Sequence, residues 1–279
     1  MRFYSYRVPT LTFLLYSLLA CSGGESRATQ GSSDDGFGDV GSPRESESAR
    51  LPAYETVAVD DGGAVAGTVR LSASLPPPAT RKVLKDLAIC GEHTPDPSIE
   101  LGQENTIANV VVSLVGVTQG KDMPELPNST KLDQKQCVYI PHIQIVPSGT
   151  SVDIYNSDPI LHNVHATMNG GTTIFNLALP VQGFRIRRRL DDPGLVSLKC
   201  DAGHTWMSGY IVVQEHPYYA LTTAQGAYLI GDVPAGEYRL RTWHEWLGES
   251  EVQVVIEAGT TTTVDLELTP PEDVEREPS

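Results

Sequence analysis

The spacing of apolar and polar residues predicts short β-strands along most of the chain. Ile143 and Ile145 alternate with polar residues, as do Val152 and Ile154, and the Pro-Ser-Gly-Thr segment between the two pairs is typical of a turn. In a strand, this alternation places one row of side chains in a core and the other row in solvent. Beyond the N-terminal segment, no stretch has the long apolar period of an amphipathic helix.

More strands of this kind are expected along the chain. An apolar run that begins at Val110 suits a buried strand, and residues 195–198 and 210–213 are short apolar segments. Residues 184–190 place apolar side chains on one face of a strand and arginines on the other. The 25 glycines and 20 prolines agree with many turns. The predicted fold class is therefore all-β, an antiparallel β-sandwich or Greek-key barrel.

Residues 216–269 predict a second, smaller β-domain. Short strands are expected at 227–230, 238–243, 252–256 and 261–268. The pattern resembles the carboxypeptidase regulatory-like (transthyretin-like) module, in which a Thr-x₃-Gly-x-aromatic hairpin precedes Val-Pro-x-Gly-x-Tyr. The matching residues are Thr222, Gly226, Tyr228, Val233, Pro234, Gly236 and Tyr238. Each of them serves a turn or a core position, so this resemblance implies a small β-sandwich and no particular chemistry.

Residues 1–20 have the composition of an export signal. Arg2 and Arg7 precede a short apolar core at 11–19, and Cys21 follows Leu-Leu-Ala. The arrangement resembles a bacterial lipobox, whose cysteine is acylated and becomes the mature N-terminus; an ordinary secretory signal cut nearby is the alternative. The chain is therefore expected outside the cytoplasm, anchored to a membrane by lipid on Cys21, on the periplasmic side of the outer membrane or at the cell surface.

The segments 21–55 and 270–279 are expected to lie outside the folded domains as a tether and an acidic tail. They contain few apolar residues and cannot bury enough surface to offset the entropy of ordering. Acidic residues outnumber basic ones 35 to 20 in the whole chain. That excess argues against nucleic acid as a partner, because such binding needs clustered Lys and Arg. After the signal, no apolar stretch is long enough to predict a transmembrane helix.

Two segments of the expected sandwich carry residues suited to metal binding. The first contains His162, and the second contains Cys200, His204 and Met207. A thiolate and two imidazoles surround copper in a plane, and a thioether adds a weak axial contact, which together make a blue-copper electron-transfer site. Zinc prefers four strong ligands, and a thioether is a poor one. The pattern therefore predicts one type 1 copper ion bound by these four residues.

The same two segments resemble the plastocyanin and amicyanin cupredoxins. In that family, one ligand lies in a Pro-His-Asn-Val segment and the other three in a short Cys-x₂-His…Met loop before the last strand. The matching residues are His162, Asn163, Val164, Cys200, His204 and Met207. This chain has Leu161 in place of the proline, and three residues instead of two separate Cys200 from His204.

The resemblance implies a cupredoxin Greek-key β-sandwich over residues 56–215, with an insertion near 74–106. A cupredoxin followed by a regulatory-like module is also the order in bacterial proteins labelled methylamine-utilisation or plastocyanin-like. The implied role is to carry single electrons between a redox-protein donor and acceptor. No enzymatic activity is expected, because the sequence lacks the His-x-His and His-Cys-His patterns of catalytic copper enzymes. Val196 stands where a binuclear copper centre needs a second cysteine, and no Cys-x₂-Cys-His haem motif occurs.

Two other interpretations stay open. The β-domains can form a structural or carbohydrate-binding surface lipoprotein whose metal site is vestigial or holds another ion. The extra residue between Cys200 and His204 is the observation that favours this alternative. A copper storage or delivery protein is the third interpretation, and it requires labile Cu(I) with little redox cycling. Intense visible absorption from a thiolate–Cu(II) bond separates the electron carrier from both alternatives.

The remaining cysteines and histidines are expected to be structural. Cys90 and Cys137 are the other cysteines of the folded region, and a disulfide between them in an oxidising compartment leaves Cys200 free for metal. On a strand, His165 would face the side opposite to the first candidate ligand. His142 is expected to pack near the site without binding the metal.

Three further features have structural or functional interpretations. Trp206 lies between two candidate ligands and is expected to cover the copper from water. The Trp-His-Glu-Trp segment at 243–246 is expected to be a packed strand end that can dock against the first domain. The arginines at 185–189 form either a solvated strand face or a docking site for an acidic redox partner.

Overall fold

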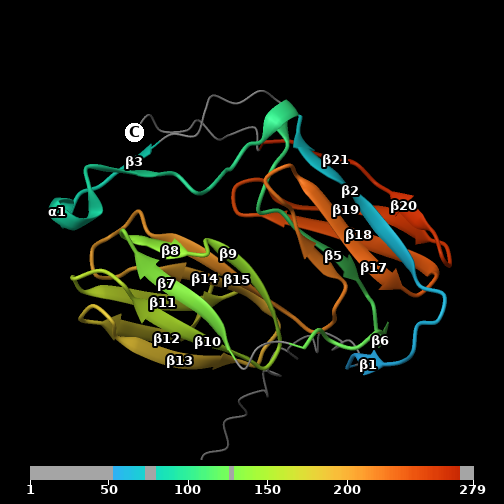
Figure 1. Ribbon diagram of the computed structural model, residues 1–279, viewed down its shortest axis with the longest axis horizontal. Helices are drawn as coiled ribbons and strands as arrows, with labels where there is room; N and C mark the ends of the chain where they lie inside the picture. Colours follow the sequence, from blue (N-terminus) through green and yellow to red (C-terminus); the bar gives the residue numbers. More distant parts are fainter. Residues whose placement is uncertain (1–52, 73–79, 126–128, 271–279) are drawn as a thin grey trace, which may run out of the picture. The chain divides into compact units, whose positions relative to one another are not determined.

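The computed structural model of the chain describes residues 53–72, 80–125 and 129–270 (Figure 1). The expected signal, Cys21, nearly all of the expected tether and the acidic tail lie outside these ranges. Within them the chain is all-β, as predicted, and the helical segments are α1 (Leu87–Cys90) and a 3₁₀ turn at Gln103–Asn105. No helix in the described ranges is long and apolar enough to span a membrane.

One pair of sheets is built from residues 130–214. The first is a five-stranded sheet in the order β12-β11-β14-β15-β9, and the second is a four-stranded sheet in the order β13-β10-β7-β8. The five-stranded sheet contains β9 (Ile143–Pro147), β11 (His162–Met168), β12 (Thr172–Leu179), β14 (Gly194–Lys199) and β15 (Ser208–Gln214). The four-stranded sheet contains β7 (Thr130–Lys135), β8 (Val138–Ile140), β10 (Thr150–Asn156) and β13 (Arg185–Leu190). We call this pair the first sandwich.

Alternating apolar residues of both sheets form the core of the first sandwich. Val152 and Ile154 on β10 and Val164 and Ala166 on β11 are buried in one apolar cluster. These are positions two apart, so the observed burial follows the period expected for strands with one face in the core. The alternation that marked Val152 and Ile154 in the sequence is therefore confirmed.

A second pair of sheets has a separate core. Its four-stranded sheets have the orders β16-β5-β18-β19 and β17-β2-β20, and β21 also pairs with β2. Their strands are β2 (Gly63–Leu71), β5 (Val111–Val115), β16 (Tyr219–Leu221), β17 (Ala227–Val233), β18 (Gly236–His244), β19 (Gly248–Ile256), β20 (Thr261–Thr263) and β21 (Leu266–Leu268). Val65, Val112, Leu240 and Ile256 are buried in one cluster. We call this pair the second sandwich.

The division of the chain into domains differs from the expected one. We expected residues 56–215 to form one domain, but β2 pairs with β17 and β5 pairs with β18 of the C-terminal part. The physical reason is that β2 and β5 each lie in the middle of a sheet, between two strands from the C-terminal part. Without β2 and β5, the strands after residue 215 cannot form complete sheets. The first sandwich therefore begins at β7, and the second is assembled from segments before and after it.

The smaller elements connect the sheets. β1 (Glu55–Thr56) pairs in parallel with β6 (Gln119–Gly120), and β3 (Thr80–Lys82) pairs antiparallel with β4 (His93–Pro95). The hairpin of β3 and β4 and the helix α1 between them fall within the expected insertion at 74–106. The β3–β4 hairpin and α1 therefore belong to neither pair of sheets.

Candidate metal centre

Neighbouring strands of the five-stranded sheet bring the candidate ligands together. His162 is the first residue of β11, and Cys200 directly follows β14, which pairs with both β11 and β15. His204 and Met207 lie in the connection from β14 to β15, residues 200–207, which we call the metal loop. The loop is closed by a hydrogen bond of 3.0 Å from the Met207 N–H to the His204 carbonyl.

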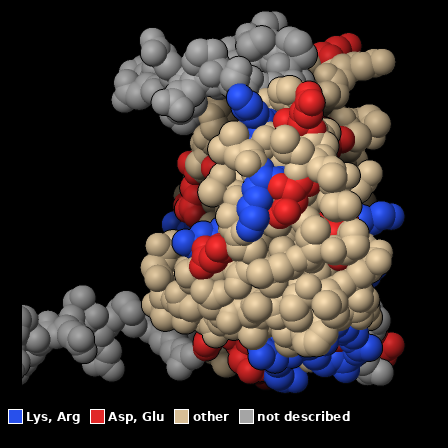
Figure 2. Space-filling view, turned by 90° about the vertical axis from the view of Figure 1, so that its left-hand side faces the viewer, with Lys and Arg blue, Asp and Glu red and all other residues tan. Residues whose placement is uncertain are grey.

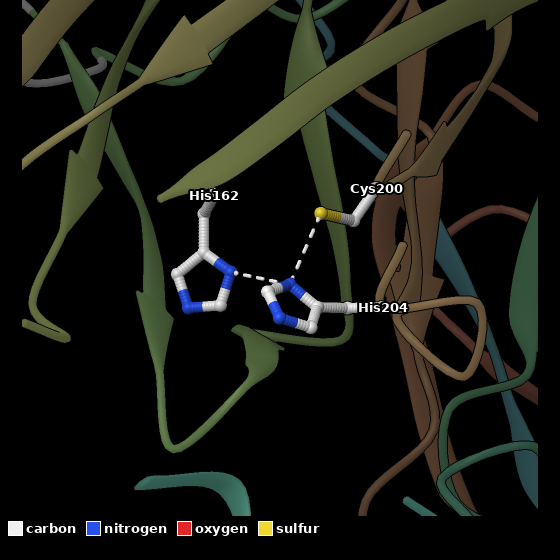
Figure 3. Close-up of side chains that lie close together, drawn as sticks. All are labelled: His162, Cys200 and His204. Carbon is white, nitrogen blue, oxygen red and sulfur yellow. Dashed lines mark hydrogen bonds between the residues drawn. The ribbon is translucent and has the colours of Figure 1, made fainter. Parts of the chain in front are cut away.

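The extra residue between Cys200 and His204 is accommodated by a glycine. Gly203 has a φ of +94°, a backbone conformation that glycine adopts far more readily than residues with a side chain. The chain therefore turns back between the cysteine and the histidine, and both side chains point to the same place despite the longer spacing (Figure 3).

Three buried donor atoms converge at this place. Ligand atoms of His162, Cys200 and His204 all lie within 4.8 Å of one another. The two Nδ1 atoms are 3.1 Å apart, and Cys200 Sγ lies 3.6 Å from His204 Nδ1 (Figure 3). Both imidazoles are completely buried, and the cysteine is 5% exposed. The structure thus brings together three of the four residues that the sequence predicts as ligands.

Carboxylates on the far side of each ring decide which nitrogen faces the centre with a lone pair. His162 Nε2 lies 2.8 Å from Asp158 Oδ2, and His204 Nε2 lies 2.8 Å from Asp86 Oδ2. An ionised carboxylate only accepts hydrogen bonds, so each Nε2 carries the proton and each Nδ1 presents its lone pair. Two facing lone pairs repel unless a cation lies between them. With a sulfur beside them, this donor set fits copper.

Burial also shapes the protonation of the ligands. It lowers the pKa of His162, which favours the neutral imidazole that a metal ion needs, while the hydrogen bond to Asp158 acts in the opposite direction. Burial raises the pKa of the Cys200 thiol, and backbone N–H groups of the metal loop and of Asn163 on β11 partly oppose this by stabilising the thiolate. Since a thiolate is the binding form, metal binding at this site releases a proton.

The two other residues of the metal loop that the sequence analysis considered, Met207 and Trp206, are both buried. Met207 is 1% exposed and belongs to the same apolar cluster as Cys200. Trp206 is 5% exposed, and its ring centre lies 5.2 Å from that of His204. The indole Nε1 donates to the Cys137 carbonyl at 3.1 Å. Trp206 therefore packs directly against one of the candidate ligands.

Cys90 and Cys137 form a disulfide, with their Cα atoms 5.3 Å apart. Cys137 Sγ also lies within 4.8 Å of ligand atoms of Asp158 and His162, but a sulfur in a disulfide is not a thiolate and this second group is not a metal site. Among the described residues, Cys200 is the free cysteine.

Asp158 and Asp86 are the residues that our sequence analysis missed. Besides His162, Asp158 accepts the backbone N–H groups of Gln136 at 2.8 Å and Cys137 at 2.9 Å. These two residues form the turn between β7 and β8, and both have positive φ, as in the two-residue turns of hairpins. A carboxylate four residues before a candidate histidine was a signal for Asp158, whereas nothing local pointed to Asp86.

The remaining histidines lie away from the converging donors. His165 Nδ1 contacts Asp201 at 2.7 Å, and its Nε2 contacts the Thr173 hydroxyl at 2.8 Å, so both nitrogens have other partners. His142 Nδ1 donates to the Ser208 carbonyl at 3.1 Å, and its Nε2 contacts Glu245. His142 thus joins the end of the metal loop to the Trp-His-Glu-Trp segment.

The arginines of β13 are paired with acidic neighbours. Arg185 and Arg187 contact Asp153 on β10 at 3.0 and 2.7 Å, and Arg189 contacts Asp191 at 2.6 Å. Arg187, with a hydrogen bond from Ser129, holds the pKa of Asp153 far below its usual value. These pairs favour the interpretation of a solvated strand face, because part of the positive charge is already neutralised locally.

The end of the first sandwich that carries the metal loop has a largely uncharged surface. Figure 2 looks onto the side of the molecule where α1 lies in Figure 1, and a broad area there carries neither acidic nor basic residues. Segments next to the candidate ligands also expose apolar side chains, among them Leu87 in α1 and Leu161 beside His162. An uncharged area with exposed apolar residues is typical of a surface that contacts another protein.

Comparisons with known proteins give structural similarities only. No model of a protein family matches the sequence, and no curated protein matches it either. A purple cupredoxin from Nitrosopumilus maritimus is similar over 31% of this chain and 100% of its own, with 24% identity and a TM-score of 0.27. Amicyanin from Paracoccus versutus is similar over 33% of this chain and 86% of its own, with 16% identity and a TM-score of 0.28.

A copper-containing nitrite reductase from Thermus scotoductus SA-01 is similar over 35% of this chain, with 21% identity and a TM-score of 0.28. The matched part is 26% of the reductase. The first of these proteins is described as a cupredoxin, and the reductase is described as containing copper. At such identities and TM-scores, the similarities do not by themselves assign a function to this chain, and the proposal below stands on its donor atoms.

Proposed function

We propose that the chain binds one copper ion, which His162, Cys200 and His204 would hold with Met207 as a weaker fourth ligand, and that it carries single electrons between redox proteins. The convergence of two Nδ1 lone pairs and one sulfur in a buried pocket carries this proposal. Bound copper would supply one-electron chemistry between Cu(I) and Cu(II). A thiolate and two neutral imidazoles suit both oxidation states.

The chain holds its ligands in a way that favours electron transfer over catalysis. Each imidazole is fixed from behind by a carboxylate, and the metal loop is tied into the sheet at both ends. A site that is already arranged needs little movement when its charge changes. The complete burial of His162 and His204 also leaves no open approach for a substrate along either ring.

The setting of the site supports a role outside the cytoplasm. A lipid on Cys21 would anchor the chain, on the periplasmic side of the outer membrane or at the cell surface. The disulfide Cys90–Cys137 agrees with an oxidising compartment. The uncharged surface at this end of the first sandwich suits brief contact with a protein donor and acceptor (Figure 2).

The test is to titrate the metal-free protein with Cu(II) and to record visible and EPR spectra. We expect one equivalent of copper, intense visible absorption and a small copper hyperfine splitting. Cys200→Ser should lose the absorption, because a hydroxyl cannot supply the soft thiolate. Ser197→Ala, which changes a hydroxyl on β14 outside the donor set, is the matched control and should keep it.

The outcome separates this proposal from the two alternatives. Tight binding of colourless Cu(I) without reversible oxidation would point to copper storage or delivery. A folded protein that binds neither copper form would contradict the proposal and favour a structural or carbohydrate-binding lipoprotein.

A further inference from the structure

A segment outside both sandwiches lies along the metal loop. Residues 80–96, which we call the cover segment, contain the β3–β4 hairpin and α1. Lys85 Nζ donates to the Ala202 carbonyl at 2.6 Å, and Arg81 donates to the Trp206 carbonyl at 3.0 Å. The two contacts fall on either side of His204 in the sequence, so the cover segment follows the loop across the candidate ligand.

Between these two contacts, Asp86 reaches the ligand itself. Its carboxylate accepts the Nε2–H of His204 at 2.8 Å. Nε2 lies on the side of the imidazole that points away from the donor cluster (Figure 3). The Asp86 side chain is 33% exposed while His204 is completely buried, so the carboxylate lies between the imidazole and solvent. Asp86 has a φ of 53°, a left-handed conformation that aspartate and asparagine tolerate better than most residues.

The disulfide joins this contact to the one that holds the other histidine. Cys90 lies in α1, and its N–H donates to the Asp86 carbonyl at 3.0 Å. Its partner Cys137 donates its own N–H to Asp158, the carboxylate on His162. A single covalent bond therefore connects the two short pieces of chain that present a carboxylate to each imidazole.

The cover segment has little else to keep it in place. Helix α1 has four residues, and a helix of that length is not stable alone. Val83 and Cys90 are the buried apolar residues of the segment, whereas Leu84 and Leu87 are 69% and 51% exposed. Its position thus depends on the disulfide, on Val83 in the core of the first sandwich and on the polar contacts to the metal loop.

We propose that the cover segment is a positioning element of the copper centre. Asp86 determines which nitrogen of His204 carries the proton and how the imidazole is oriented. The Cys90–Cys137 disulfide covalently connects the segment of Asp86 to the β7–β8 turn. While the disulfide and these contacts are intact, the side chains of the metal-binding residues keep their orientation. Solvent and external chelators then reach the centre slowly. This inference rests on the proposed copper site and names the part of the chain that controls metal exchange.

The first measurement needs no metal. Hydrogen exchange of the metal loop is compared in the metal-free full chain for wild type, Asp86→Asn and the double variant Cys90→Ala/Cys137→Ala. We expect exchange of residues 200–208 to rise at least about tenfold in both. Asp86→Asn replaces the charge-assisted hydrogen bond to His204 by a weaker neutral one, and the double variant removes the covalent bond that holds the segment. Glu92→Gln removes an exposed carboxylate of the same segment that contacts neither histidine, and it should match wild type.

The second measurement follows copper. Transfer of copper from the loaded protein to excess chelator should be about 10- to 100-fold faster in Asp86→Asn, the usual effect of losing a carboxylate behind a metal-bound histidine. Glu92→Gln should again match wild type. Asp86→Asn keeps the disulfide and nearly the same shape, so it decides the matter even if the double variant does not fold.

The two proposals fail in different ways. If wild type binds no copper, the proposed function is wrong, while loop exchange in the metal-free protein still tests the cover segment. If Asp86→Asn equals wild type in loop exchange and, where copper binds, in its release, the cover segment does not position the centre. Faster exchange of the loop in Asp86→Asn and not in Glu92→Gln would support it.

Discussion

Removing the Asp158 carboxylate should destabilise the protein more than its single charge suggests. Asp158 is 5% exposed and accepts three N–H groups, of which those of Cys137 and His162 belong to buried residues. In Asp158→Ala these two donors lose their partner without regaining water. A buried donor left unpaired costs about 1–3 kcal/mol, so two of them should lower the free energy of unfolding by about 4 kcal/mol.

The matched control is Asp153→Ala. Asp153 is almost as buried, at 6% exposure, and it also accepts several hydrogen bonds, but Arg185 and Arg187 are about half exposed. Their guanidinium groups return to water when the carboxylate is lost, so the loss of stability should be smaller than in Asp158→Ala. The difference between the two variants therefore measures the cost of buried N–H donors that have neither a protein partner nor water.

The assay is urea unfolding of the metal-free proteins at neutral pH, followed by tryptophan fluorescence and analysed for the free energy of unfolding. The slope against urea should match in all three proteins, so that differences in midpoint report stability. A loss below about 1 kcal/mol for Asp158→Ala, or one no larger than for Asp153→Ala, would refute the reasoning that unpaired buried donors dominate.

Two more predictions concern the second sandwich. Burial lowers the pKa of His244 to about 4, below the value of about 6.5 in an unfolded chain, so the unfolded state binds more protons between these values and stability falls as pH drops through that window. Urea unfolding at pH 7 and pH 4.5 should show that His244→Gln loses less stability on acidification than wild type, and an equal loss would contradict this assignment. A chain that ends at Glu215 lacks β16 to β21, which exposes the apolar faces of β2 and β5. Size-exclusion chromatography should show aggregates, and a soluble monomer of ordinary size would mean that these strands do not need their C-terminal partners.

The candidate ligands could be predicted from the sequence because their chemistry and spacing are local. Cys200, His204 and Met207 lie within one loop, and the order of residues around His162 marks a strand start. The disulfide followed from the few cysteines available. The all-β class could be predicted because each strand with one buried face requires alternating apolar and polar residues in its own sequence.

The pairing of distant segments could not be predicted in this way. The alternation in β2 and β5 indicates strands but not their neighbours, and their partners β17 and β18 come after the whole first sandwich. Asp86 is separated from His204 by 118 residues, and a single exposed-looking aspartate next to a lysine carries no local signal of its contact. Such contacts depend on the folded arrangement and not on any local pattern.

The order of segments in the second sandwich has a consequence for how the protein is made. Strands β2 and β5 leave the ribosome long before β17 and β18. The first sandwich has all of its sheet partners between residues 130 and 214, so it can fold as soon as that stretch has emerged. The two earlier strands must meanwhile stay unpaired with their apolar residues uncovered. During synthesis, β2 and β5 are therefore the described strands of this chain that most need a chaperone.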